Sequence, residues 1–263
     1  MEWHQSYKAS PQQVGFLDLP RELRDYVYGF AFRVNGAILI YSPNPYAVRP
    51  TTKAMLIRHK GEGPVEPQPL GNIIPMALPR ACRQLHAECS AVLYGANAFC
   101  IWFLSDTVLK LGYRQLVRHM IFTAEVDHRI FGIDLDEVSY WWKRRFWPTL
   151  VQNGISKLES FSSLETLTLP IKPPRYGASW KPAFFAVENK TREQRISLAA
   201  NWMRARSPLE DRRLRECLQI EIEPPSGLSK DEYEGSRFAP DEAEKEWDEN
   251  EFMDAFELMK TLS

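Results

Sequence analysis

Short strand-like segments alternate with helical segments through the second half of the chain. Aliphatic and β-branched residues predict strands at 120–126, 165–169 and 218–223. Helical spacing of apolar residues predicts helices at 136–153, 191–206 and 208–216. Parallel strands need a crossover connection, and that crossover is usually a helix. The alternation therefore predicts an α/β fold whose irregular βα units form a small, largely parallel sheet.

These βα units repeat only loosely. The strand centres at Ile121, Leu167 and Ile220 lie about 46 and about 53 residues apart, whereas leucine-rich repeats recur every ~20–29 residues. We therefore expect irregular, leucine-rich-repeat-like units.

An amphipathic helix is predicted near the N-terminus, beginning close to Asp18. The Asp18 carboxylate can accept a backbone N–H at a helix start, and Pro20 suits the first turn because its missing N–H costs nothing there. Apolar residues recur at helical spacing and form one face, comprising Leu19, Leu23, Tyr26, Val27 and Phe30. The charged residues fall mostly on the opposite face, at Arg21, Glu22, Arg24 and Asp25. A short β-rich strand at 37–41 follows this helix.

A second helix is predicted over 78–94. Its core-facing stripe consists of Leu78, Cys82, Leu85, Cys89 and Val92. Gly95 suits the end of this helix, and a buried strand is expected at 99–103. The stretch 43–75 is dense in Pro and Gly and predicts a long, mobile loop.

Length and charge predict one domain with a tail. A chain of 263 residues fits one large domain or two small ones. We place an α/β domain at 14–226 and an acidic C-terminal extension at 227–263. Residues 230–263 hold twelve acidic and four basic side chains, a net charge of −8. Because the whole chain carries −1, the remainder carries +7.

The tail predicts an amphipathic helix over 241–262. Its anchoring aromatic residues are Trp247, Phe252 and Phe256. Two interpretations stay open: the helix folds back on the basic body, or it docks into a partner's groove.

The residues indicate no assembled catalytic or metal site. Nucleotide-binding, zinc-protease and serine-hydrolase motifs are missing, and the five histidines are scattered. Cys82, His86 and Cys89 share a helix face, so their side chains could in principle bind one metal ion. Both cysteines lie on the apolar stripe, however, and no fourth ligand is near. We therefore expect no enzyme activity, no bound metal and no cofactor.

Basic residues form two clusters. Lys143, Arg144 and Arg145 are flanked by aromatic residues, a pattern that suits nucleic acid but also an amphipathic helix with its cations in water. The second cluster comprises Arg204, Arg206, Arg212, Arg213 and Arg215. It could contact nucleic acid or receive the acidic tail.

The ends and apolar runs indicate an intracellular location. The N-terminus lacks the basic start and apolar stretch of a secretory signal, and no apolar run approaches the ~18 residues of a membrane span. We expect the cytoplasm or the nucleus, with no membrane association. The oligomeric state is left open.

Two segments resemble a fungal F-box-like protein family. The segment 17–28 is similar to the opening of an F-box, whose first helix begins with Leu-Pro-x-Glu followed by Leu or Ile, and 81–99 is similar to the second signature of the family. The resemblance implies that a Skp-type adaptor contacts Leu19, Pro20, Leu23 and Val27. It also implies that the later α/β region receives a ubiquitylation substrate.

The expected function is therefore noncatalytic protein binding, as a substrate receptor of a cullin-type ubiquitin ligase. An F-box continues directly into two more helices, whereas a strand and a Pro-rich stretch follow here. The second interpretation is accordingly a scaffold of the same fold without a ubiquitin link, its first helix built into the core. A nucleic-acid-associated factor is the third.

Overall fold

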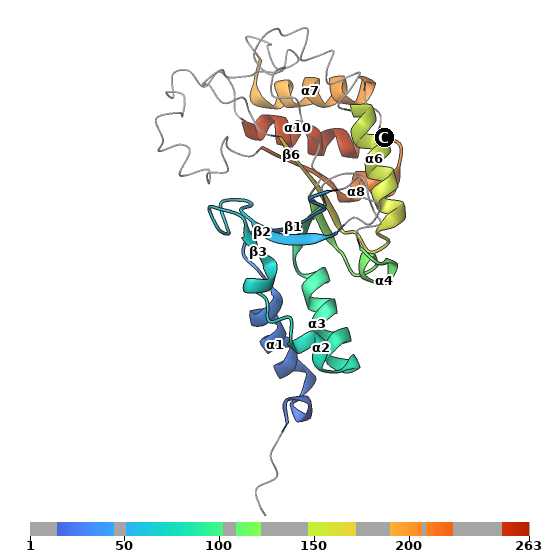
Figure 1. Ribbon diagram of the computed structural model, residues 1–263. Helices are drawn as coiled ribbons and strands as arrows, with labels where there is room; N and C mark the ends of the chain where they lie inside the picture. Colours follow the sequence, from blue (N-terminus) through green and yellow to red (C-terminus); the bar gives the residue numbers. More distant parts are fainter. Residues whose placement is uncertain are drawn as a thin grey trace, which may run out of the picture.

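The computed structural model describes residues 15–44, 51–101, 109–121, 147–171, 190–206, 209–222 and 249–262. Within these residues the chain forms a seven-stranded sheet in the order β3-β2-β1-β4-β5-β6-β7 (Figure 1). The strands are β1 (Ala37–Tyr41), β2 (Lys53–Ile57), β3 (Gln68–Pro69), β4 (Ala98–Ile101), β5 (His119–Ile121), β6 (Thr166–Ile171) and β7 (Leu218–Ile222). The pairs β1·β4, β4·β5, β5·β6 and β6·β7 are all parallel. The predicted α/β fold with a largely parallel sheet is confirmed.

The helices flank this sheet and project from it. They are η1 (Phe16–Asp18), α1 (Arg21–Phe32), η2 (Leu70–Asn72), α2 (Leu78–Ala81), α3 (Arg83–Gly95), α4 (Leu111–Arg114), α6 (Trp147–Ser160), α7 (Arg192–Arg206), α8 (Arg212–Cys217) and α10 (Glu249–Thr261). Helices α1, α2 and α3 extend away from the sheet at one end of the molecule. Helices α7 and α10 lie side by side at the other end (Figure 1).

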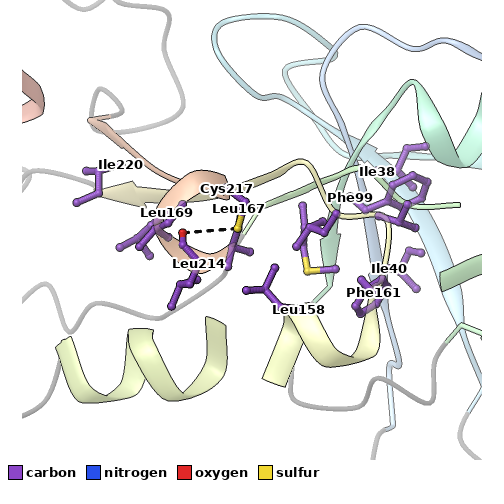
Figure 2. Close-up of a cluster of buried hydrophobic side chains, with 14 of the residues drawn as sticks. Ile38, Ile40, Phe99, Leu158, Phe161, Leu167, Leu169, Leu214, Cys217 and Ile220 are labelled. Carbon is purple, nitrogen blue, oxygen red and sulfur yellow. Dashed lines mark hydrogen bonds between the residues drawn. The ribbon is translucent and has the colours of Figure 1, made fainter. Parts of the chain in front are cut away.

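The two faces of the sheet differ in composition. Alternate residues of each strand point to opposite faces, and one set enters the main core, as Leu167 and Leu169 of β6 do. Figure 2 shows these leucines beside Leu158 of α6 and Leu214 of α8. The opposite face carries a small apolar cluster around Ala37, Cys100 and Ile121, and it becomes polar toward β7.

The prediction of a long loop at 43–75 is wrong for most of the residues that the structure describes there. Strand β2 pairs antiparallel with β1, and β3 pairs antiparallel with β2. Leu56, Leu70 and Ile74 are buried in the main core. The Pro and Gly residues mark the ends of these short elements, and the apolar residues between them fix the segment to the sheet.

The predicted helix at 78–94 is broken at Cys82. This residue has an extended backbone, with φ −157° and ψ 169°, and its Sγ accepts a hydrogen bond from the Leu85 N–H at 3.5 Å. Cys82 therefore caps the start of α3, as polar side chains do at helix starts. As a result Cys82 is exposed, whereas Leu85 and Cys89 of the predicted stripe are buried.

Several predicted boundaries shift. Asp18 closes the short turn η1 by accepting the Gly15 N–H at 2.7 Å, and α1 begins three residues later, with Pro20 at its N-cap. The predicted helix at 136–153 is described only from Trp147, places Pro148 in its first turn, and continues to Ser160. The segments 102–108 and 122–146, which hold the ends of two predicted strands, lie outside the described residues.

Helix α10 belongs to the main core. Phe252, Ala255, Phe256 and Met259 are all buried there, and α10 packs against α7 and β7. Its Lys260 Nζ donates to the Leu218 carbonyl of β7 at 2.8 Å. The C-terminal segment, expected as an extension, thus completes the fold over the described residues 249–262.

Two glycines with positive φ, Gly36 just before β1 and Gly63 after β2, lie against each other beside the end of β2. Gly36 has φ +103°, and a Cβ there would lie 2.4 Å from the Ile57 carbonyl oxygen. We expect Gly36→Ala to lower the free energy of unfolding by about 2 kcal/mol or more, because the backbone conformation and the contact are both unfavourable. The matched control is Gly29→Ala inside α1, where nothing lies within 4 Å. Urea unfolding should show no loss for this control, and equal losses for both variants would contradict the strain at Gly36.

Candidate functional site

Helix α1 buries a charged residue and exposes apolar ones. Arg24 is only 8% exposed, and Tyr28 and Phe32 are fully buried on the same side. The outward side carries four large apolar residues: Leu23 (53% exposed), Tyr26 (67%), Val27 (39%) and Phe30 (76%). We call these four residues the α1 outer stripe. They lie at i, i+3, i+4 and i+7, so they form one continuous face of the helix.

A buried ionic network holds the inward side of α1 against α3. The Arg24 guanidinium donates to both carboxylate oxygens of Glu88 at 3.0 Å, and the Tyr28 hydroxyl donates to the same carboxylate at 2.7 Å. Arg24 also donates to the carbonyls of Leu17 and Leu19. Because the buried charges are paired and hydrogen-bonded, they are tolerated in the interior. The network therefore sets which side of α1 faces outward.

The network perturbs the ionisation of its members. The hydrogen bond from Arg24, followed by that from Tyr28, lowers the pKa of Glu88 to about 2. Burial, together with the hydrogen bond to Glu88, raises the pKa of Tyr28. Glu88 therefore stays ionised and Tyr28 stays protonated over the physiological range.

Glu88→Gln should make this contribution visible as a pH dependence. Because the folded-state pKa lies below the ordinary 4.5, the carboxylate stabilises the fold above about pH 4.5, and this stabilisation is lost as the pH falls toward 2. We expect a lower unfolding midpoint for the variant at pH 7, and a difference from the wild type that shrinks below pH 4.5. Thermal unfolding between pH 2 and pH 7 measures this, with the exposed Glu66→Gln as control. A constant difference would show that Glu88 does not act through its charge.

Side-chain contacts also fix both ends of α1. The ring of Phe16 packs edge-on against Tyr28, with 5.7 Å between centroids. At the other end, the buried Asn97 amide donates to the carbonyls of Phe32 and Leu93 and accepts the Val34 N–H. The outward orientation of the α1 outer stripe is therefore a fixed property of the fold.

Three of the four expected adaptor contacts reach the surface. Leu23 and Val27 point outward, Pro20 is exposed just before the helix, and Leu19 is half-buried. Tyr26 and Phe30, whose rings pack edge-on 4.8 Å apart, extend the surface beyond those contacts. Their helical spacing was the signal that could have assigned them to the site. Glu88, which orients the helix, gives no local signal because it lies 64 residues from Arg24.

Cys82, His86 and Cys89, the residues considered as metal ligands, each have a different structural role. Cys82 caps α3, and the His86 ring nitrogens lie 3.0 Å from the Pro79 carbonyl oxygen and 2.9 Å from the Tyr113 hydroxyl. Burial raises the pKa of the Cys89 thiol to about 11, so it remains protonated at neutral pH. No group of three potential metal ligands is found within the described ranges.

The predicted basic residues do not form one free patch where they are described. The Arg213 guanidinium donates to the carbonyls of Leu158 and Phe161 and so caps the end of α6. Arg212 pairs with Glu216, Arg204 is exposed, and Arg215 is half-buried. Lys143, Arg144 and Arg145 lie outside the described residues, as does the Arg206 side chain.

The aromatic residues expected to anchor the tail pack into the core of this same chain where they are described. Phe252 is fully buried and Phe256 is 1% exposed, so neither is available to a partner's groove, and Trp247 lies outside the described residues. Acidic side chains of α10 pair with α7, as Arg195–Glu251 and Arg192–Asp254. Folding back is thus the observed arrangement, but the arginines involved are not those of the expected cluster.

Among the helices that the structure describes, none combines the length and the apolar character that a bilayer crossing requires. Searches of family models, curated proteins and solved structures found no match to this chain. The geometry of α1 is therefore the strongest indication of function.

Proposed function

We propose that this chain is a noncatalytic protein-binding module, an F-box-like substrate receptor of a cullin-type ubiquitin ligase. The α1 outer stripe binds a Skp-type adaptor, and the α/β region receives the protein to be ubiquitylated. This role places the protein inside the cell, in the cytoplasm or the nucleus.

The exposure of the α1 outer stripe carries this proposal. Large apolar side chains scattered singly over a surface are ordinary, whereas a contiguous apolar face is typical of an interaction site. Burying one such side chain in an interface contributes roughly 1.5–3 kcal/mol. The helix could bury this stripe only by exposing Arg24 and Tyr28, and the network with Glu88 prevents that rotation.

The position of α1 also favours docking. The helix projects from the sheet together with α2 and α3 (Figure 1), and its α1 outer stripe is 39–76% exposed from Leu23 to Phe30. Amphipathic helices commonly bind by laying an apolar face into a partner's groove, with anchors at i, i+3, i+4 and i+7. The α1 outer stripe has this spacing.

A scaffold without a ubiquitin link is the second candidate. The observation that favours it is the network of Arg24, Tyr28 and Glu88, which builds α1 into a self-contained fold with α3. Under this alternative the same stripe binds a protein other than a Skp-type adaptor.

Calorimetric titration of the purified chain with a Skp-type adaptor separates these two candidates. We expect a one-to-one complex with a Kd of about 1 μM or tighter, because four apolar side chains leave water together. Circular dichroism must first show that the chain is folded. A folded chain that releases no heat and does not co-elute with the adaptor would favour the scaffold.

A further inference from the structure

A cavity of about 410 Å³ lies on the sheet face opposite the main core. Its floor is formed by β4, β5, β6 and β7, through residues that include Ala98, His119, Thr166 and Gln219. Its wall is formed by the turn at 59–62, which follows β2. Ligand pockets typically enclose about 300–1,000 Å³, so the size suits a small ligand or a short peptide segment.

The floor carries an ordered set of uncharged hydrogen-bonding groups. Thr166 pairs in register with His119, and Thr168 pairs in register with Gln219. The His119 Nδ1 lies 2.9 Å from the Thr166 hydroxyl. Adjacent strands are about 4.8 Å apart, and residues two apart along a strand are about 6.7 Å apart. An extended peptide presents successive groups on one edge at this same two-residue spacing.

The wall is rigidly built. His59 and Glu62 exchange two backbone hydrogen bonds of 2.9 and 3.0 Å, and Arg58 Nε donates to the Gly61 carbonyl at 3.2 Å. Lys60 has φ +53°, a left-handed conformation that is uncommon outside glycine. Strained backbone of this kind clusters at binding sites, where the surrounding structure holds it.

An ion pair closes the wall onto the far strand of the floor. The Lys60 Nζ lies 3.2 Å from Glu221 Oε2 of β7, so the turn reaches across the sheet face. The cavity lining itself carries one lysine, Lys60, and one carboxylate, Glu62. The lining therefore has no excess of one charge, which disfavours phosphate or nucleic acid and favours neutral hydrogen-bonding groups.

We propose that this cavity binds a short extended peptide of a partner protein through uncharged polar groups. Thr166, Thr168 and Gln219 hydrogen-bond to its amides, and the turn at 59–62 limits its length. This inference rests on the proposed receptor function, because the bound peptide would be a segment of the substrate protein that the receptor recruits.

The test selects a phage library of random twelve-residue peptides on the immobilised full-length chain. Enriched peptides are synthesised, and their Kd is measured by fluorescence anisotropy. Thr166→Val keeps the side-chain shape and removes the hydroxyl, so we expect binding about five- to tenfold weaker. Gln219→Leu, at an exposed position, should have a similar effect. The matched control is Thr261→Val on α10, which should change the Kd by less than about twofold, as should raising NaCl from 50 to 300 mM.

Two outcomes would overturn the proposal. One is that no peptide is enriched above an unrelated control protein. The other is that enriched peptides bind Thr166→Val and Gln219→Leu as tightly as the wild type. A glycan array run in parallel covers the competing ligand class, and glycan binding lost in Thr166→Val without peptide binding would assign the cavity to carbohydrate. Leu23→Asp should retain full peptide binding, so failure at this cavity is distinguishable from failure of adaptor binding at α1.

Discussion

Leu23→Asp is expected to weaken binding to a Skp-type adaptor at least about 100-fold and to leave the fold intact. The wild-type side chain loses its water on docking, whereas a carboxylate in its place would be buried without a partner. Leu23 is 53% exposed in the free chain, so the substitution removes little packing there. Calorimetry with the adaptor and thermal unfolding of the free variant measure the two effects. Val27→Asp should behave in the same way.

The matched control is Leu111→Asp on α4. Leu111 is 65% exposed and lies outside the α1 outer stripe, so its substitution should change neither adaptor binding nor stability. If Leu23→Asp lowers the unfolding midpoint by more than about 5 °C, the stripe contributes to the core and the scaffold interpretation gains. If both aspartate variants on α1 bind the adaptor as tightly as the wild type does, the docking surface lies elsewhere.

Phe256→Ala is expected to lower the free energy of unfolding by about 3–5 kcal/mol, the usual effect of removing a fully buried aromatic side chain. The ring is 1% exposed between α10 and its neighbours α7 and β7, and Lys260 Nζ lies 5.6 Å from its centroid. Urea unfolding of both proteins measures the difference. The expected loss is a large fraction of the stability of an ordinary domain.

Glu257→Ala is the neighbouring control for Phe256→Ala. Glu257 is on the exposed side of α10 and pairs with Lys260 at 2.9 Å, so its loss should cost less than about 1 kcal/mol. Equal stabilities of Phe256→Ala and wild type would show that α10 is not part of the core. The tail would then be free to dock into a partner.

The parallel part of the sheet was predictable because its signal is local. Strands β6 and β7 have aliphatic residues at alternate positions, β5 is a short apolar run that includes Met120 and Ile121, and a helix separates each strand from the next. The alternation of Thr and Leu in β6, and of Gln and Glu with aliphatic residues in β7, also indicates a polar face. That face holds the cavity, which was not predictable from the sequence because β4, β5, β6 and β7 assemble it from distant segments.

The orientation of α1 was not predictable from its own residues. Its helical spacing defines an apolar face and a charged face, and the usual expectation is that the apolar face turns inward. Glu88 reverses this choice by binding Arg24 and Tyr28 across 64 and 60 residues. Strand β2 was missed for a similar reason, since its five residues form a strand only by pairing with β1.

Site-specific photo-crosslinking tests the docking of α1 most directly. A benzoylphenylalanine in place of Phe30 puts the reactive group on the α1 outer stripe, where the native side chain is 76% exposed. The same group in place of Leu198, which is 43% exposed on α7, serves as control. With a Skp-type adaptor present, we predict an adaptor crosslink from position 30 and none from position 198. A complex that crosslinks from position 198, or one that forms without a crosslink from position 30, would contradict the account.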